Sequence, residues 1–551
     1  MRRNGLFVLL GFLFVFFQKA ERDLAQNGNI VWNGKYLLWI LLISLAAGGL
    51  LGYAAGEAVH RIPTLLSKKF LHGEKRVLPA GAFAIIFLLI VLSWLPCYLA
   101  YYPAICSYDT DVQTGQIESH SYNDHHPIAH TLLLEGAMNI GKNIFGDTNT
   151  GIGIYGCLQL LFLAGAFTYG NYLVNRTGSS PILQLLLLLY EMFYPFHWYM
   201  SISTIKDTVF SGFFLLQMLS IYAILRSKRN SLRPAGQDAL FFVSTLGMIL
   251  FRNNGKYAML VLLCICLLGL WRDKEYRKCQ GRLLANAFLA FVVGNISLTL
   301  LFSAVGAEQG DKREMLSMPI QQLARCMIYH GGAGLLPEDD NSMSEEDKAL
   351  IRDFLLDESY LEYRPDISDP VKRHTNTYVV RYRTEDFIRT YLHLLAEYPG
   401  DFVNAALAVN AGYLAPGDVS HALINVNGAE RGLGYVQTRW VEDVLRERGI
   451  YKDSKWESLH EALESWADGN GYLKLPILKY LFVPGTYLWL YLLLAAVLLT
   501  QKKYRMLLPL SLALGYYVTL FLGPTVQLRY LYPIMIALPF AATLALNPQK
   551  E

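Results

Sequence analysis

The chain has 551 residues, of which 53% are hydrophobic, 13% aromatic and only 17% charged. With a mean hydropathy of +0.27, it is too apolar to be an ordinary soluble enzyme of this size. The net charge of +3 is small, and the Lys and Arg residues fall in short loops, which argues against nucleic acid as a partner. We therefore expect an all-α protein that crosses the plasma membrane many times.

Long apolar stretches predict the membrane helices, since an α-helix needs roughly 20 apolar residues to cross the hydrocarbon core. The first stretch follows Met1-Arg2-Arg3 as in a signal peptide, but no small-residue cleavage site comes after it, so we expect a retained anchor helix. The sequence predicts about twelve spans, near residues 5–17, 36–57, 79–100, 150–174, 181–200, 204–225, 238–251, 257–271, 283–305, 479–500, 505–523 and 529–546.

Clusters of basic residues set the predicted topology, because loops rich in Lys and Arg stay in the cytoplasm. Four such loops fall on the same side: Lys68, Lys69, Lys75 and Arg76; Arg226, Lys228, Arg229 and Arg233; Arg272, Lys274, Arg277 and Lys278; and Lys502, Lys503 and Arg505. Both termini are then cytoplasmic, provided that residues 130–145 lie along the membrane interface or re-enter instead of crossing.

The predicted spans divide the chain into four regions. Residues 1–78 hold two extra N-terminal helices, 79–305 form a membrane module with a first outer loop at 101–149, and 479–551 hold the last spans. Between them, residues 306–478 shift sharply to charged and polar composition, with apolar residues at helical spacing in places. We expect this region to be a mainly helical extracytoplasmic domain.

Cysteine placement bears on the outer side of the protein. Only Cys106 and Cys326 are predicted to lie there. A disulfide between them stays open, because sequence alone cannot bring two distant residues together.

A polar cluster directly after the span 79–100 is the first candidate site. It comprises Ser107-Tyr108-Asp109-Thr110-Asp111 and Asn123-Asp124-His125-His126-Pro127. Carboxylates and imidazoles this close to a bilayer are costly unless they have a task. We expect Asp109, Asp111 and His126 to be catalytic, with His125 in support.

Structural roles remain open for the same residues. Asp109 could cap a helix or form an Asx-turn. The role of a histidine before Pro127 could be purely structural, to brace an extended turn. A divalent metal ion on Asp109, Asp111 and His126 also stays open, although their separation of about fifteen residues matches no defined ligand spacing.

Further polar residues are predicted at the same membrane surface. They are Lys206 and Asp207; Arg252, Asn253, Asn254 and Lys256; Gln322 and Arg325; and Arg529 and Tyr530. Any one of them could belong to a wet outer loop. Charges in hairpins of a few residues, however, must face either headgroups or a cavity, and together they suggest a cavity.

The signs of these charges suggest a ligand. Four cations, Lys206, Arg252, Lys256 and Arg529, stand on the side that the positive-inside rule least favours, so a fixed phosphate or pyrophosphate would account for them. A carboxylate facing a phosphate-activated centre suggests group transfer, with Asp109 taking a proton from an incoming hydroxyl.

These residues resemble those of the GT-C superfamily of polytopic glycosyltransferases, which includes protein O-mannosyltransferases, oligosaccharyltransferase catalytic subunits and the aminoarabinose transferases of lipid A. The similar elements are Asp109 in SYDTD, the following HHP at His125–Pro127, and RYLYP at Arg529–Pro533. Seven predicted spans, counted from 79–100, also precede the large outer domain. The blocks HHP, IKD, FRNNG and residues 314–325 are similar to a bacterial membrane family of unknown function.

The GT-C resemblance implies an enzyme that moves a sugar from a polyprenyl-phosphate or pyrophosphate donor to a cell-envelope glycan, lipid or protein at the outer face, with inversion. It implies Asp109 as the general base or as a carboxylate that orients the acceptor, and the four cations as ligands of the donor phosphate, although only Arg529 matches a family element directly. The resemblance names no cofactor. The chain departs from the family pattern in its two extra N-terminal spans, in Asp109-Thr110-Asp111 instead of an adjacent Asp-Glu pair, and in lacking WWDYG.

Two other classes stay open. A lipid or polysaccharide transporter or flippase would use intramembrane charges, and Glu191 in the span 181–200 is such a residue. No inverted repeat is evident, however. A non-catalytic scaffold or sensor would explain the outer domain but not the charges in the hairpins.

Overall fold

The computed structural model describes residues 4–30, 32–66, 78–226, 235–269, 274–310, 312–334, 340–416, 439–468 and 471–546. These residues form helices and isolated β-bridges, and no β-strand element occurs among them. The predicted all-α fold class is therefore confirmed for the described part of the chain. Three of the four basic loops, around 68–76, 228–233 and 272, lie wholly or partly outside the described residues.

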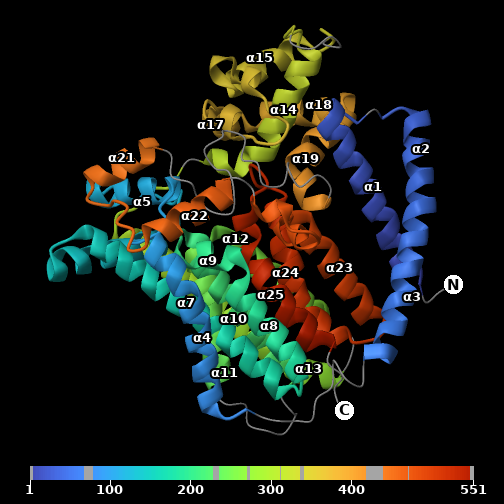
Figure 1. Ribbon diagram of the computed structural model, residues 1–551. Coiled ribbons are helices and arrows are strands. Elements are labelled where there is room, and N and C mark those ends of the chain that lie inside the picture. The colour runs from blue at the N-terminus through green and yellow to red at the C-terminus, as the bar shows by residue number, and fades with distance from the viewer. Residues whose placement is uncertain are drawn as a thin grey trace.

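A bundle of long apolar helices forms the larger part of the molecule (Figure 1). Its members are α1 (Gly5–Asn27), α2 (Gly34–Ile43) continued by a π-turn into α3 (Gly49–Leu66), α4 (Ala80–Ala100), α7 (Thr148–Arg176), α8 (Pro181–Phe193), α10 (Lys206–Arg226), α11 (Ala235–Phe251), α12 (Asn253–Gly269), α13 (Lys274–Ala304), α23 (Pro484–Thr500), α24 (Leu507–Leu520) and α25 (Leu528–Leu546).

Six helical stretches in the described residues are long and apolar enough to cross a membrane. They are 34–61, 80–100, 148–176, 206–226, 283–304 and 528–546. Shorter apolar helices occur at 181–193, 236–251, 253–268 and 484–500. Three stretches are mostly buried by other helices: the most apolar window is 83% buried in Lys206–Arg226, 67% in Leu528–Leu546 and 61% in Thr148–Arg176. These three helices therefore form the centre of the bundle.

The predicted span at 181–200 is wrong as a single helix. It breaks at Tyr194, which has ψ 112° and separates α8 from the short α9 (Pro195–Ile202). Pro195 explains the break, because a proline lacks the N–H that would continue the helix and pushes the preceding residue to extended backbone. The helix that contains the first predicted span, 5–17, continues through a mostly polar segment to Asn27.

The stretch predicted to lie along the interface is helical. It forms α6 (Ile128–Ile140), which a π-turn extends through Phe145. Gly141 and Gly151 bring this segment against α7, because an added Cβ on Gly141 would meet the backbone of Gly151. The segment is not one of the helices apolar enough to cross a membrane.

The region predicted as a mainly helical polar domain is helical where it is described. Helices α14 (Ser317–His330), α15 (Glu345–Phe354), α17 (Thr377–Tyr382), α18 (Thr384–Glu397) and α19 (Pro399–Leu414) gather at one end of the bundle (Figure 1). They have their own apolar core, which includes Leu323, Met327, Phe354 and Phe402. Further short helical turns occur at Lys312–Leu316, Leu356–Glu362, Asp369–Lys372, Gly471–Lys474, Leu478–Phe482 and Tyr504–Met506.

The two helices at the N-terminus pack on one flank of the molecule (Figure 1). Glycines let α1 and α3 approach closely, because a Cβ on Gly52 would meet the backbone of Phe7 and Val8. Trp32, between the helices, donates a hydrogen bond of 2.9 Å from Nε1 to Asn404 Oδ1 on α19. The N-terminal region is thus joined both to the bundle and to the polar domain.

Cys106 and Cys326 do not form a disulfide in the described structure. Cys106 and Cys326 are both free and buried, and they belong to different apolar cores.

Candidate functional site

The site begins with α5 (Tyr108–Ser119), which follows the loop after α4. Ser107 is the N-cap residue, and its N–H donates a hydrogen bond of 3.0 Å to the Thr110 hydroxyl. Asp109 therefore does not cap the helix. It lies in the first turn, where exposed N–H groups favour a carboxylate.

Backbone pairing brings the IKD block to the same place. The N–H of Ile105 donates to Ile202 O at 3.1 Å, and the N–H of Thr204 donates to Ile105 O at 2.9 Å. The hydroxyls of Thr110 and Thr204 lie 2.6 Å apart. These contacts fix the start of α10, and hence Lys206, beside the first turn of α5.

Four predicted residues converge at this point. Lys206 Nζ donates to Asp109 Oδ2 at 2.8 Å and to His126 Nδ1 at 3.0 Å. Arg529 Nη1, from the start of α25, lies 3.4 Å from the same Asp109 oxygen. His126 Nδ1 lies 3.9 Å from that oxygen. We call these four residues the Asp109 cluster.

The cluster holds a buried carboxylate in its charged form. Burial alone would raise the pKa of Asp109, but the positive charges of Arg529 and Lys206 hold it well below its usual range. Its side chain is only 12% exposed. Asp109 is therefore an anion whose charge two neighbouring cations balance.

His126 presents an unused donor to the cluster. Burial and the charge of Lys206 lower the pKa of His126 well below its usual value, so the imidazole is neutral. An ammonium group can only donate, so Nδ1 accepts from Lys206 and the ring proton resides on Nε2. Among the described residues Nε2 is buried without a hydrogen-bond partner. A buried donor of this kind favours a ligand that accepts from it.

A second ion pair lies next to the cluster. Arg252, which precedes α12, forms an ion pair with the fully buried Asp207. The guanidinium carbons of Arg252 and Arg529 each lie 4.9 Å from the centre of the Tyr530 ring. Tyr530 thus connects the two arginines, but Asp207 already balances the charge of Arg252.

Asp111 does not join Asp109, although only two residues separate them. Arg448 Nη1 donates to Asp111 Oδ1 at 2.6 Å and to the Thr114 hydroxyl at 2.9 Å, and its Nε donates to Glu118 Oε2 at 3.0 Å. Arg448 follows α21 (Arg439–Glu447) in the polar region. Asp111 therefore ties that region to α5.

Two of the predicted site residues belong to the polar domain and are buried in its interior. Gln322 donates to Phe402 O at 3.2 Å. Arg325 donates to Asp401 Oδ1 at 2.9 Å and to Gly28 O at 3.1 Å. Both side chains have these structural partners and are not part of the Asp109 cluster.

Four of the predicted site residues lie outside the Asp109 cluster. Lys256 Nζ lies 5.1 Å from the ring centre of its neighbour Tyr257, and Asn253 is exposed at the start of α12 with the half-buried Asn254 after it. His125 is exposed, and its ring packs edge-on against that of His126 at 4.6 Å. None of the four contacts Asp109 in the described structure.

A chain of buried amides and rings supports the site and was not predicted. Gln113 bonds His130 Nδ1 at 2.9 Å, His130 Nε2 lies 2.8 Å from the Tyr155 hydroxyl, and that hydroxyl donates to Gln159 Oε1 at 2.6 Å. Gln159 Nε2 then donates to Ser203 O at 2.8 Å. Burial lowers the pKa of His130 to about 3, so this ring is a neutral link. Polar residues at i and i+4 of an apolar helix, as in Tyr155 and Gln159, were the available signal.

The residues present do not form a metal site. Within the described ranges, no group of three or more His, Cys, Asp or Glu side chains is placed to hold a metal ion. Asp109 has cations as neighbours, and Asp111 is turned to Arg448. We therefore derive no step through a metal.

Fold and site together define a helical protein with several helices able to span a membrane and a charged cluster where α5, α10 and α25 begin. The chain belongs to a family of unknown function (DUF6020), whose model matches residues 117–551. The match includes His126, Lys206 and Arg529 and starts within α5, after Asp109. No curated protein and no solved structure matches the chain.

Proposed function

We propose that this protein is a membrane glycosyltransferase of the GT-C type, which transfers a sugar from a polyprenyl-phosphate or pyrophosphate donor to a cell-envelope acceptor. The observation that carries the proposal is the Asp109 cluster: a buried carboxylate, two cations and an imidazole with an unused donor, contributed by segments far apart in the chain. A purely structural ion pair would not need the unpartnered Nε2 of His126.

The cluster contains the groups that the reaction needs. The donor phosphate would take Lys206 and Arg529 as its counter-charges, and His126 Nε2 would donate to one of its oxygens. Drawing the cations toward the phosphate would raise the basicity of Asp109, because their charges are what depress it. Binding of the donor would thus prepare the base.

The proposed step balances as an inverting substitution. The acceptor oxygen forms a bond to the anomeric carbon while the bond from that carbon to the phosphate oxygen breaks. The acceptor proton passes to Asp109, and the polyprenyl phosphate leaves with the electron pair. Lys206 and Arg529 stabilise the charge that develops on the leaving phosphate.

The proposed topology has twelve spans, cytoplasmic termini and an extracytoplasmic domain at 306–478. Its support is that each predicted span falls on one or two described helices, and that α5, which carries Asp109, lies at the same end of the bundle as the polar helices (Figure 1). The donor would then be a lipid-linked sugar presented at the outer face of the plasma membrane.

Transfer by the purified protein tests the proposal. We expect radiolabelled sugar to move from one of a panel of polyprenyl-phosphate sugars, and Asp109→Asn to slow transfer by about 10²- to 10⁴-fold, the contribution of a general base. Asp111→Asn is the matched control, because it makes the same change on the same helix outside the cluster. Undiminished transfer by Asp109→Asn, or no reaction with any donor, would contradict the proposal.

Transport of a lipid or glycan is the alternative that one observation favours. Glu191 on α8 is fully buried; its Oε2 accepts from Asn171 Nδ2 at 2.6 Å, while Oε1 has no hydrogen-bond partner among the described residues. Intramembrane carboxylates of this kind often mark transport paths. Lipid movement in reconstituted vesicles that Glu191→Gln abolishes and Asp109→Asn leaves intact would support transport over transfer.

A further inference from the structure

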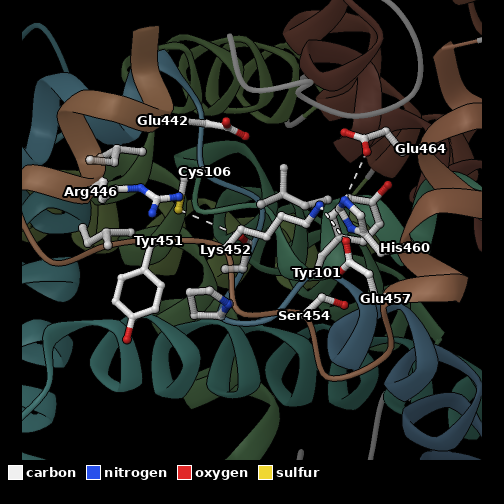
Figure 2. Close-up of a pocket in the computed structure, with 15 residues that line it drawn as sticks. Tyr101, Cys106, Glu442, Arg446, Tyr451, Lys452, Ser454, Glu457, His460 and Glu464 are labelled. Carbon is white, nitrogen blue, oxygen red and sulfur yellow. Dashed lines mark hydrogen bonds and ion pairs between the residues drawn. The ribbon is translucent and has the colours of Figure 1, made fainter. Parts of the chain in front are cut away.

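A cavity of about 300 Å³ lies beside the segment that precedes α5 (Figure 2). One wall is formed by residues 101 and 103–106, and the opposite wall by α21, the segment that follows it and α22 (Glu457–Asp468). No member of the Asp109 cluster lines it. It is therefore separate from the site described above, although Cys106 in its wall is three residues from Asp109.

The two walls are held together by defined contacts. The N–H of Asp453 donates to Tyr102 O at 2.9 Å, and the N–H of Lys455 donates to Leu99 O at 2.8 Å. Arg448, through Asp111, secures the other end of the same segment to α5. The cavity is thus a built feature of the joint between the two parts of the molecule.

The lining carries charges of both signs, so it disfavours a ligand with a large net charge of either sign. Glu442, Glu457 and Glu464 would repel a phosphate, whereas Arg446 and Lys452 would repel a metal ion or a diamine. An apolar ligand would leave the buried ring nitrogens of His460 without partners. A neutral ligand with many groups that both donate and accept hydrogen bonds suits this mixed lining.

His460 points to the same chemistry. Its side chain is 3% exposed, and its Nε2 lies 3.2 Å from Glu464 Oε2. Burial and the charge of Lys452 lower its pKa, so the ring is neutral, with one nitrogen that carries a proton and one that accepts. Both ring nitrogens are buried without a hydrogen-bond partner in the described structure, so one of them is an unused acceptor. An acceptor in this state calls for a hydroxyl donor.

The shape of this end of the cavity fits a small ring. The Tyr101 ring packs edge-on against His460 at 4.4 Å. Lys452 extends across the cavity toward His460 and Glu457, with its Nζ 3.5 Å from Glu457 Oε1 (Figure 2). A volume of about 300 Å³ is at the lower limit of ligand pockets, which hold roughly 300–1,000 Å³. One small molecule, not an oligomer, matches this volume.

We infer that this cavity is a binding site for a neutral saccharide, whose hydroxyls donate to the unprotonated ring nitrogen of His460, to Glu457 and to Glu464, and accept from Lys452. The Cys106 thiol in the wall takes no chemical part, since burial raises its pKa to about 11 and keeps it protonated. Saccharide binding in this cavity does not depend on the proposed transfer reaction.

Calorimetry on the full-length protein in detergent tests the inference, with glucose, galactose, mannose and N-acetylglucosamine as probes and with inorganic phosphate and putrescine as charged comparisons. We expect at least one sugar to bind and neither charged probe to compete. Glu464→Gln should weaken sugar binding about tenfold, as for the loss of one charge-assisted hydrogen bond. Glu461→Gln, on the same helix but outside the lining, should bind as the wild type does.

Further variants separate this site from the Asp109 cluster. Glu457→Gln should weaken binding in the same direction as Glu464→Gln, and its exposed position makes it a second test if Glu464→Gln fails to fold. Asp109→Asn should bind the sugar as the wild type does, whether or not transfer occurs. Binding of phosphate or putrescine but no sugar, unchanged binding in both glutamine variants, or loss of sugar binding in Asp109→Asn would each overturn the inference.

Discussion

At the scale of single residues, the Asp109 cluster depends on charges that cannot be removed one at a time without cost. Lys206 and Asp109 are both largely buried, with side chains 17% and 12% exposed. Removing one member of a buried pair leaves the other charge without its counter-charge. Arg529, 3.4 Å from the same oxygen, limits that cost in this protein.

A double-mutant cycle measures the pair. We expect Lys206→Met to lower the free energy of unfolding of the wild type. In the Asp109→Asn background the same change should lower it by about 1–3 kcal/mol less, because the partner charge is already gone. The measurement is denaturant-induced unfolding in detergent. Lys256→Met is the control, since Lys256 contacts no carboxylate in the described structure and should change stability by under about 0.5 kcal/mol. Additive effects of Lys206→Met and Asp109→Asn would mean that the pair does not interact.

Much of this cluster could be predicted from the sequence, because its members stand at helix ends in an otherwise apolar chain. Asp109 and His126 were selected because they follow a predicted span closely, and Lys206 and Arg529 because they lie in short hairpins; the four do converge. What the sequence could not show is which charges were already balanced. The pairing of Asp111 with Arg448 joins residues 337 positions apart, and no local pattern indicates such a contact.

At the scale of helices, hydropathy predicts apolar segments well and their interruptions less well. The spans at 79–100 and 529–546 agree with α4 and α25 within one residue at each end. The span at 181–200 contains the break at Pro195, which an average over hydropathy does not register although the proline itself is visible. The contact of α1 with α3 was not predicted, because it depends on which glycines face each other.

That contact makes a prediction about two glycines of α3. A Cβ on Gly52 would meet the backbone of α1, whereas a Cβ on Gly49 would only touch Val8 Cγ1 at 3.9 Å. We expect Gly52→Ala to destabilise the protein by about 1–3 kcal/mol through overpacking. Gly49→Ala should be neutral or stabilising by up to about 1 kcal/mol, since alanine favours the helix. Unfolding midpoints in detergent compare the two, and equal midpoints would refute close packing at Gly52.

At the scale of the whole molecule, a charged network connects the polar domain to the N-terminal helices. Arg325 on α14 donates to Asp401 and to Gly28 O, and Asp401 Oδ2 lies 2.9 Å from His330 Nε2. The His330 ring also stacks on Tyr398 at 3.9 Å. The residues after α1 therefore depend on the charge state of groups in a distant part of the chain.

The pH dependence of this network has a definite sign. Burial opposes protonation of His330, but hydrogen bonds to Asp401 and Asp340 raise its pKa above 6.5, the ordinary value. A group whose pKa is raised on folding stabilises the folded state. This stabilisation is complete at pH values below the pKa of the unfolded state and is lost as the pH rises through the pKa of the folded state. The pKa of Asp401 is lowered from 3.8: burial opposes its charge, but His330 and Arg325 outweigh that effect. Its contribution is present above pH 3.8 and lost as the pH falls through the lowered value.

We therefore expect the polar domain to lose stability as the pH rises from about 6.5, the unfolded histidine value, toward alkaline conditions. Hydrogen exchange at the amides of α14 and α19, corrected for the intrinsic pH dependence of exchange, measures the change. His330→Asn should remove most of the dependence, because it cannot bind the proton that links pH to folding. His374→Asn changes a more exposed histidine of the same domain and should retain the dependence. A dependence that survives in His330→Asn would assign it to another group and leave the Arg325–Asp401 contact as a pH-independent link.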